Sequence, residues 1–186
     1  MRKVLFMFGV LNDSDIEWMV RSGQRRTIRG GETVIQEGVP IGSIILVLQG
    51  RMGIEIDGAG EIAQIEEGDV VGEMSLIDSA PPSATVLAKI DALALFIDKG
   101  VLQQKLASDA SFASRFYRAL AILLSDRLRA TERRMAYGKR MDLANENKRY
   151  QDELDPEVLD RLALAGERFD RLRKLVEESE IRKHHR

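Results

Sequence analysis

A series of short β-prone runs between Arg25 and Asp98 limits the fold of this chain more than any other feature. The runs recur about every eight to twelve residues and are separated by turn residues such as Gly50 and Asp57-Gly58. No segment between them is long enough for a helical crossover, so neighbouring strands are expected to pair antiparallel. The expected strands are 33–36, 43–49, 51–57, 61–65, 69–71, 83–89 and 92–98.

This pattern predicts a mainly β fold with α-helices. The strands are expected to form an antiparallel jelly roll of the cupin-like, double-stranded β-helix type, followed by a long C-terminal helix and a helical tail. We divide the chain accordingly into residues 1–135, the β domain with its C-terminal helix, and residues 136–186, a polar helical extension without a recognisable helix-turn-helix.

Helical periodicity flanks the strand series. Residues 12–23 predict a short helix with Asn12 or Asp13 as its N-cap and Gly23 just past its end. A second short helix is expected over 98–109, and a long one from Asp109 or Ser111. The apolar stripe of the long helix must be covered by another surface; it consists of Phe112, Phe116, Leu120, Leu123, Leu124, Leu128 and Met135.

The C-terminal part begins after a predicted helix break near Gly138. A last helix is expected from Pro156, because Asp155 can cap it and proline suits the first helical position. Its apolar face is broken and consists of Leu159, Leu162, Phe169, Leu172 and Val176.

Composition narrows the classes of function. The 28 Lys and Arg residues are balanced by 30 Asp and Glu, so the net charge of −2 offers no global attraction to nucleic acid or to an anionic membrane. No run approaches the ~20 apolar residues of a membrane span. The apolar segment 4–11 is interpreted as a buried leading segment rather than an export signal, because no cleavage site follows it. With no cysteine in the chain, a cytoplasmic location is expected.

The stretch "GEMSLIDSAPPSATV", residues 72–86, carries the best-defined motif. It resembles the phosphate-binding cassette of the cyclic nucleotide-binding domain superfamily, and the segment "GETVIQEGVPIGSIILVLQG" resembles the glycine-turn spacing of the same superfamily. That superfamily includes the catabolite activator of bacteria and the regulatory subunit of protein kinase A. The resemblance covers Phe8 to about Arg134. It implies a cyclic nucleotide-type jelly roll in which a one-turn helix directs backbone N–H groups at a cyclic phosphate.

The resemblance implies a ligand site and also a defect in it. Family members usually place an arginine after the first proline of the second half, where it pairs with the phosphate, and here that position is Pro82. Glu73 would accept the ribose hydroxyl proton, although the helix dipole could equally favour a carboxylate there. Arg51 and Lys89 are the cations considered as replacements, and both are expected to be solvated. The implied, degenerate ligand cassette is Gly72, Glu73, Met74, Ser75, Pro82, Ser83, Ala84 and Thr85.

No catalytic residue or metal ligand is predicted. The only histidines, His184 and His185, are adjacent in the basic tail, so neither a His-containing metal site nor a Ser-His nucleophile is supported. No resident cofactor is expected, apart from weak binding of a cyclic nucleotide or a related small anion. We therefore expect a non-enzymatic regulatory or sensor module of the bacterial type.

Two other functions remain open. In one, the pocket is vestigial and the helix carrying Phe112, Phe116, Leu120, Leu124 and Leu128 forms a homodimer or docks a partner protein. In the other, which the charge pattern disfavours, the chain is a transcription regulator of the catabolite activator type. A basic stretch does exist, but a solvated helix face explains it more simply; it consists of Arg127, Arg129, Arg133, Arg134, Lys139 and Arg140.

Overall fold

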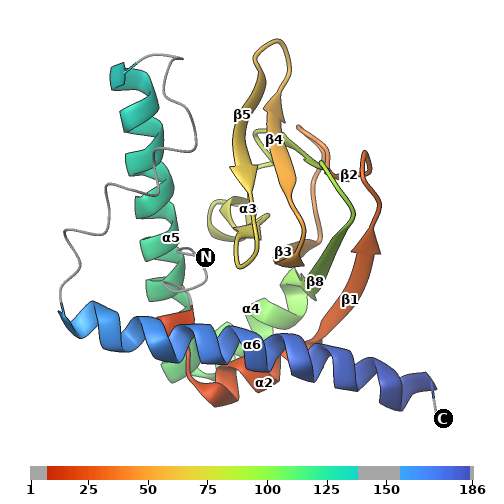
Figure 1. The fold of residues 1–186 in the computed structure, drawn as a ribbon, viewed down its shortest axis with the longest axis vertical. Helices are drawn as coiled ribbons and strands as arrows, with labels where there is room; N and C mark the ends of the chain where they lie inside the picture. The colour runs from red at the N-terminus through yellow and green to blue at the C-terminus, as the bar shows by residue number, and fades with distance from the viewer. Residues whose placement is uncertain (1–7, 138–155, 185–186) are drawn as a thin grey trace.

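The computed structural model describes residues 8–137 and 156–184 and contains two four-stranded antiparallel sheets (Figure 1). The first sheet has the order β1(Gly23–Ile28), β8(Ala92–Asp98), β3(Ser43–Gln49), β6(Val70–Val71). The second has the order β2(Thr33–Ile35), β7(Thr85–Ala88), β4(Met52–Ile56), β5(Gly60–Ile65). Strands far apart in the sequence are neighbours in both sheets, and the predicted jelly roll is confirmed.

Strand β3 explains how the layers are arranged. Ile45 and Val47 face the second sheet, whereas Ile44, Leu46 and Leu48 belong to a separate apolar cluster shared with the helices. A strand buried on both faces has a continuous apolar run instead of an alternating one, which is the pattern of "SIILVLQ". The first sheet therefore lies between the second sheet and a helical layer.

The helices are α2(Asp13–Ser22), α3(Met74–Ile77), α4(Lys99–Ser108), α5(Ala110–Tyr137) and α6(Pro156–His184). Asn12 caps α2 through a reciprocal capping box with Asp15, and Gly23 follows its end as expected. Asp109 accepts the backbone N–H of Phe112 at 2.9 Å, so the long helix begins where the sequence indicated.

The apolar stripe of α5 is covered by the chain itself along the first part of the helix. Phe112, Phe116 and Leu120 are fully or almost fully buried together with residues of α2, α4 and the first sheet. Phe8 and Leu11 of the leading segment are also fully buried there, and residues 4–7 of that segment lie outside the described residues. Farther along, Leu124 is half-buried and the Leu128 side chain is 59% exposed.

Helix α6 packs across α2, as Figure 1 shows at the bottom of the view. The expected apolar face is present over the part whose side chains are described, because Phe169, Leu172 and Val176 are buried. Phe169 meets Phe8 edge to face at 5.2 Å between ring centroids. Around this contact, Arg168 and Arg171 pair with acidic residues at the start of α2, so apolar and ionic contacts hold α6 in the same place.

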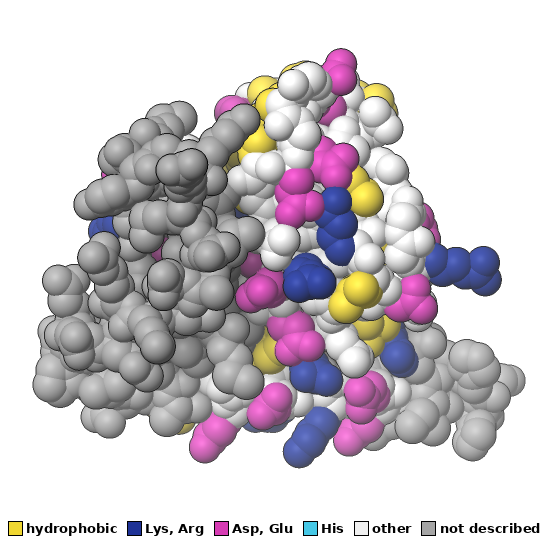
Figure 2. Space-filling model, turned by 45° about the horizontal axis from the view of Figure 1, so that its top comes forward, with side chains coloured by type: hydrophobic (Ala, Val, Ile, Leu, Met, Phe, Trp, Pro, Cys, Tyr) yellow, Lys and Arg dark blue, Asp and Glu magenta, His cyan; other side chains and the backbone are white. Residues whose placement is uncertain are grey.

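No helix within the described residues is long and apolar enough to cross a membrane. Figure 2 shows Lys or Arg and Asp or Glu side chains intermixed on the face that it presents, in keeping with a net charge near zero.

Candidate functional site

The first half of the cassette is a tight turn that leads from β6 into α3. Gly72 has φ +80°, and a Cβ atom there would lie 2.9 Å from the carbonyl oxygen of Ser43, so this position requires glycine. Leu76 anchors α3 in the apolar cluster, while the Met74 and Ile77 side chains remain about half exposed.

Glu73 is held by an unexpected partner from the long helix. Its side chain is only 3% exposed and makes no cap bond to α3. Instead, its Oε1 accepts a hydrogen bond from Arg127 Nη1 at 2.5 Å. The same guanidinium donates to the carbonyl oxygen of Val70 and lies 3.6 Å from Oδ1 of the fully buried Asp69. The cassette carboxylate is thus fixed to α5.

The prediction of a solvated basic stretch on α5 is wrong for Arg127. Its side chain is 23% exposed and pairs with two buried carboxylates, because α5 runs beside the turn between β6 and α3. Arg129 is exposed as expected, although it also makes an interaction with a neighbouring group. The side chains of Arg133, Arg134, Lys139 and Arg140 lie outside the described residues.

The second half of the cassette is held by the loop after β2. The carbonyl oxygen of Pro82 accepts the backbone N–H of Gly38 at 2.8 Å, and the Thr85 hydroxyl accepts that of Glu37 at 3.1 Å. Ser83 is exposed and Ala84 half-buried. Pro82 therefore fixes the loop through its carbonyl group, but it contributes no donor and no charge toward an anion.

The two cations considered as substitutes lie elsewhere. Lys89 is 28% exposed rather than solvated, because its ammonium bridges Glu55 and Glu61 at 2.7 Å each. These ion pairs raise the pKa of Lys89, chiefly through the hydrogen bond to Glu55, and its stem fills the space above Gly53. Arg51 is exposed and lines a cleft at one end of the roll.

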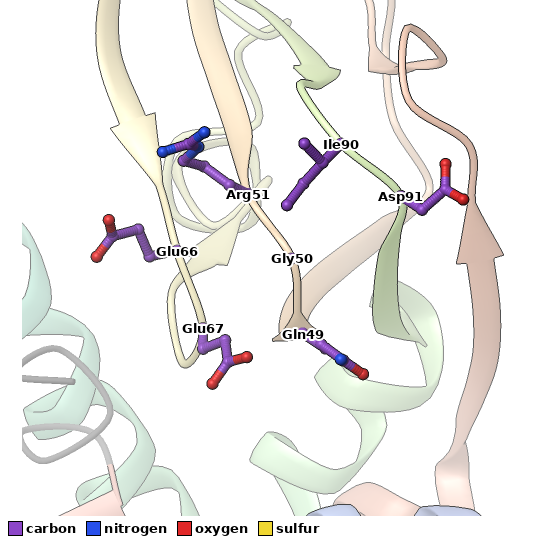
Figure 3. A pocket seen from close by; sticks show the side chains of 7 residues that line it. All are labelled: Gln49, Gly50, Arg51, Glu66, Glu67, Ile90 and Asp91. Carbon is purple, nitrogen blue, oxygen red and sulfur yellow. The ribbon is translucent and has the colours of Figure 1, made fainter.

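That cleft lies among three turns and has a volume of about 520 Å³ (Figure 3). In Figure 3, Ile90 lies beside the backbone at Arg51, the Arg51 guanidinium extends away from Ile90 toward β5, and Glu66 and Glu67 come from the turn after β5. Glu67 also lies 3.8 Å from Arg173 of α6. A second open cleft of about 540 Å³ touches the cassette only at Thr85 and has an acidic lining, with Glu37, Glu55 and Asp57.

A cation that sequence reasoning missed lies next to the first half of the cassette. Lys99, the first residue of α4, donates a hydrogen bond from Nζ to the Ser75 hydroxyl at 2.5 Å. Burial lowers the pKa of Lys99, and the charge of Glu73 opposes that shift. Neither Lys99 nor Arg127 is near the cassette in sequence, so only the fold reveals them.

Comparison with known proteins supports the fold that carries this site. Residues 25–109 match the family model described as cyclic nucleotide-binding domain. A cyclic nucleotide-binding domain from Methylobacillus flagellatus superposes with a TM-score of 0.65 at 22% identity, covering 76% of this chain and 85% of that one.

Two further similar structures are a domain of a transcriptional regulator and a catabolite activator protein. The N-terminal domain of a transcriptional regulator from Streptomyces coelicolor has a TM-score of 0.57 and 27% identity, over 69% of this chain and 94% of that one. The catabolite activator protein of Thermus thermophilus has a TM-score of 0.58 and 23% identity, over 94% and 87%. Residues 25–109 thus resemble the cyclic nucleotide-binding domain family in sequence, and the two sheets of this chain have the same fold as a cyclic nucleotide-binding domain.

Proposed function

We propose that the chain is a non-enzymatic regulatory module of the bacterial cyclic nucleotide-binding type, whose degenerate cassette binds its ligand weakly or has an altered ligand preference. The observation that carries this proposal is the ion pair between buried Glu73 and Arg127. Because this pair joins the cassette to α5, a ligand that engages Glu73 changes the forces that hold the long helix. The cassette is then the input and α5 the element that responds.

The altered binding follows from Pro82. A charge-assisted hydrogen bond contributes about 1.5–3 kcal/mol, and an arginine can donate two to one phosphate. Loss of this group lowers affinity for an ordinary cyclic nucleotide by roughly a hundredfold or more, since ~1.4 kcal/mol is tenfold. The proposed ligand-contacting residues remain Gly72, Glu73, Met74, Ser75, Pro82, Ser83, Ala84 and Thr85.

Calorimetry of the full chain with cyclic AMP, cyclic GMP and a cyclic dinucleotide tests the proposal. Pro82→Arg should raise affinity for a cyclic mononucleotide by about a hundredfold over the natural chain. Pro81→Arg is the matched control, because it adds the same charge one residue away. Tight, stoichiometric capture of cyclic AMP by the natural chain would contradict the degenerate cassette. Absence of heat with every protein at millimolar ligand would remove the sensor function.

A homodimeric or partner-docking scaffold is the second candidate function. The observation that favours it is the exposure of Leu128 on the same helix whose earlier apolar residues are buried. Phe112, Phe116 and Leu120 are already covered within the chain, so the docking surface is limited to the later part of α5. This candidate needs no ligand, and the two functions are therefore separated by the calorimetry above.

Transcription regulation is the least favoured candidate. Two of the similar structures are a domain of a transcriptional regulator and a catabolite activator protein. In this chain, however, Arg168 and Arg171 of α6 are paired with Asp13 and Glu17 of α2, which reduces the positive charge available for phosphates.

A further inference from the structure

Lys99 approaches the cassette from the side of α4. Its backbone N–H donates to the carbonyl oxygen of Gly42 at 2.9 Å, which fixes the start of the helix against the segment before β3. Its ammonium then reaches the Ser75 hydroxyl, whose oxygen also lies 3.3 Å from the carbonyl oxygen of Gly72. The positive charge is therefore at the first half of the cassette, which contains four of the proposed ligand-contacting residues.

Lys99 differs from its neighbouring cations in having no carboxylate within ion-pair distance among the described residues. Arg127 is paired with Glu73, and Lys89 with two glutamates, so both charges are compensated. The charge of Glu73 acts on Lys99 from beyond ion-pair distance. An ammonium that is partly buried and held by a hydroxyl alone retains most of its attraction for an anion.

We propose that Lys99 supplies the positive charge for an anionic ligand of this cassette, in place of the arginine that Pro82 replaces. The inference rests on the proposed function and names the residue that determines its specificity for phosphate-bearing ligands. An ammonium on a flexible four-carbon stem acts as a point charge and cannot form the two parallel hydrogen bonds of a guanidinium. Affinity should accordingly be weaker than in relatives with arginine, and should tolerate more variation in the shape of the anion.

Calorimetry with cyclic AMP and cyclic GMP tests this assignment on the full chain. Lys99→Met should lower affinity at least about tenfold, whereas Lys99→Arg should retain it. Lys105→Met is the control on the same helix, because its ammonium pairs with Asp109 away from the cassette. Circular dichroism establishes that each variant is folded.

The pH dependence of binding distinguishes charge supply from a purely structural role. Because burial lowers the pKa of Lys99, affinity of the natural chain should fall as the pH rises toward that lowered value, while Lys99→Arg should show no such fall. A pH profile that is the same in both proteins would overturn the assignment.

Pro82→Arg separates failure of this inference from failure of the proposed function. With the arginine present, Lys99→Met should lower affinity by a smaller factor than in the natural chain, because a second cation attracts the same anion. If the natural chain binds below detection, the comparison is made between Pro82→Arg and the double variant, and equal affinities overturn the role of Lys99 alone. If no protein binds at millimolar ligand, the proposed function and the role of Lys99 both fail.

Discussion

Arg127 forms ion pairs with the buried carboxylates of Glu73 and Asp69. Glu73 is 2% and Asp69 0% exposed, so removing Arg127 takes a positive charge away from two buried carboxylates. We expect Arg127→Ala to lower the free energy of unfolding by about 3 kcal/mol, measured by urea denaturation. Arg118→Ala, an exposed arginine on the same helix, should change it by no more than about 0.5 kcal/mol.

A second variant shows that charge is responsible. Glu73→Gln should recover part of the stability lost in Arg127→Ala, because a neutral amide needs no counter-charge. Equal unfolding midpoints for Arg127→Ala and Arg118→Ala would contradict the ion pair.

Gly72 can be tested by comparison with a glycine in a similar backbone conformation. Gly72 and Gly58 have φ of +80° and +73°, but an added Cβ clashes with the Ser43 carbonyl oxygen only at Gly72. Gly58→Ala should therefore cost about 1–2 kcal/mol of unfolding free energy, the strain of a positive φ. Gly72→Ala should cost more, and should also distort the cassette. Similar thermal midpoints for the two variants would show that the turn has room to adjust.

Among the helices and strands, the sequence predicts those that are specified by local residue patterns. Strand β3 was found from its apolar run, the β4 and β5 hairpin from Asp57-Gly58, and α2 from its cap and Gly23. Strand β1 was missing from the expected strands, because "GQRRTI" is mostly polar and exposed. It is a strand because its whole length pairs with β8, and this long-range pairing has no local signal.

The same limit applies to the candidate site. The cassette, with Pro82 at its usual arginine position, can be recognised from the sequence because it is one continuous segment of the chain. The cations beside the cassette cannot be recognised in this way, because Arg127 and Lys99 reach Glu73 and Ser75 from helices distant in the sequence. The basic stretch on α5 gave a weak signal, but only the packing of α5 beside α3 distinguishes Arg127 from its exposed neighbours.

The contact between α6 and α2 can be weakened at a single side chain. Phe169 is 5% exposed and packs on Phe8. If α6 unfolds together with the rest of the molecule, Phe169→Ala should lower the free energy of unfolding by about 3–5 kcal/mol. Leu164→Ala is the control on the same helix, because Leu164 is 49% exposed, and it should cost less than about 1 kcal/mol. A separate early transition of α6 in hydrogen exchange, with no change in the midpoint of the body, would show that α6 docks independently.

The start of α5 should make stability sensitive to acid. Hydrogen bonds from Lys105 and from the Phe112 backbone N–H lower the pKa of Asp109 below its ordinary 3.8, and desolvation only partly opposes them. The stability that ionised Asp109 contributes is fully present above pH 3.8 and is lost as the pH falls through the lowered pKa of the folded state. Asp109→Asn keeps a capping side chain but loses the ion pair.

The test is the urea midpoint of both proteins as a function of pH. The variant should be less stable above pH 3.8, and the difference should shrink as the pH falls below it. A constant difference at every pH would mean that the cap, rather than the charge, distinguishes them.

In the whole molecule, α5 connects the cassette with α2 through two ion pairs. Arg115 pairs with buried Asp15 of α2 at 2.6 Å, and three turns later Arg127 holds Glu73 of the cassette. Helix α2 in turn carries the acidic residues that hold α6. Through these ion pairs, α5 links the cassette to the layer where α2 and α6 pack.

The exposed later part of α5 leads to a prediction about assembly. If two copies pair there, light scattering of the natural chain should give twice the 20.9 kDa mass of one copy. Leu128→Glu should reduce the measured mass to that of one copy. Leu120→Glu is unsuitable, because Leu120 is 1% exposed and the charge would disrupt the core instead. Leu164→Glu places the same change on exposed α6 and should leave the mass unaltered. A natural chain that remains a monomer at all concentrations would remove the homodimer, and the exposed part of α5 would then be available only to a different protein.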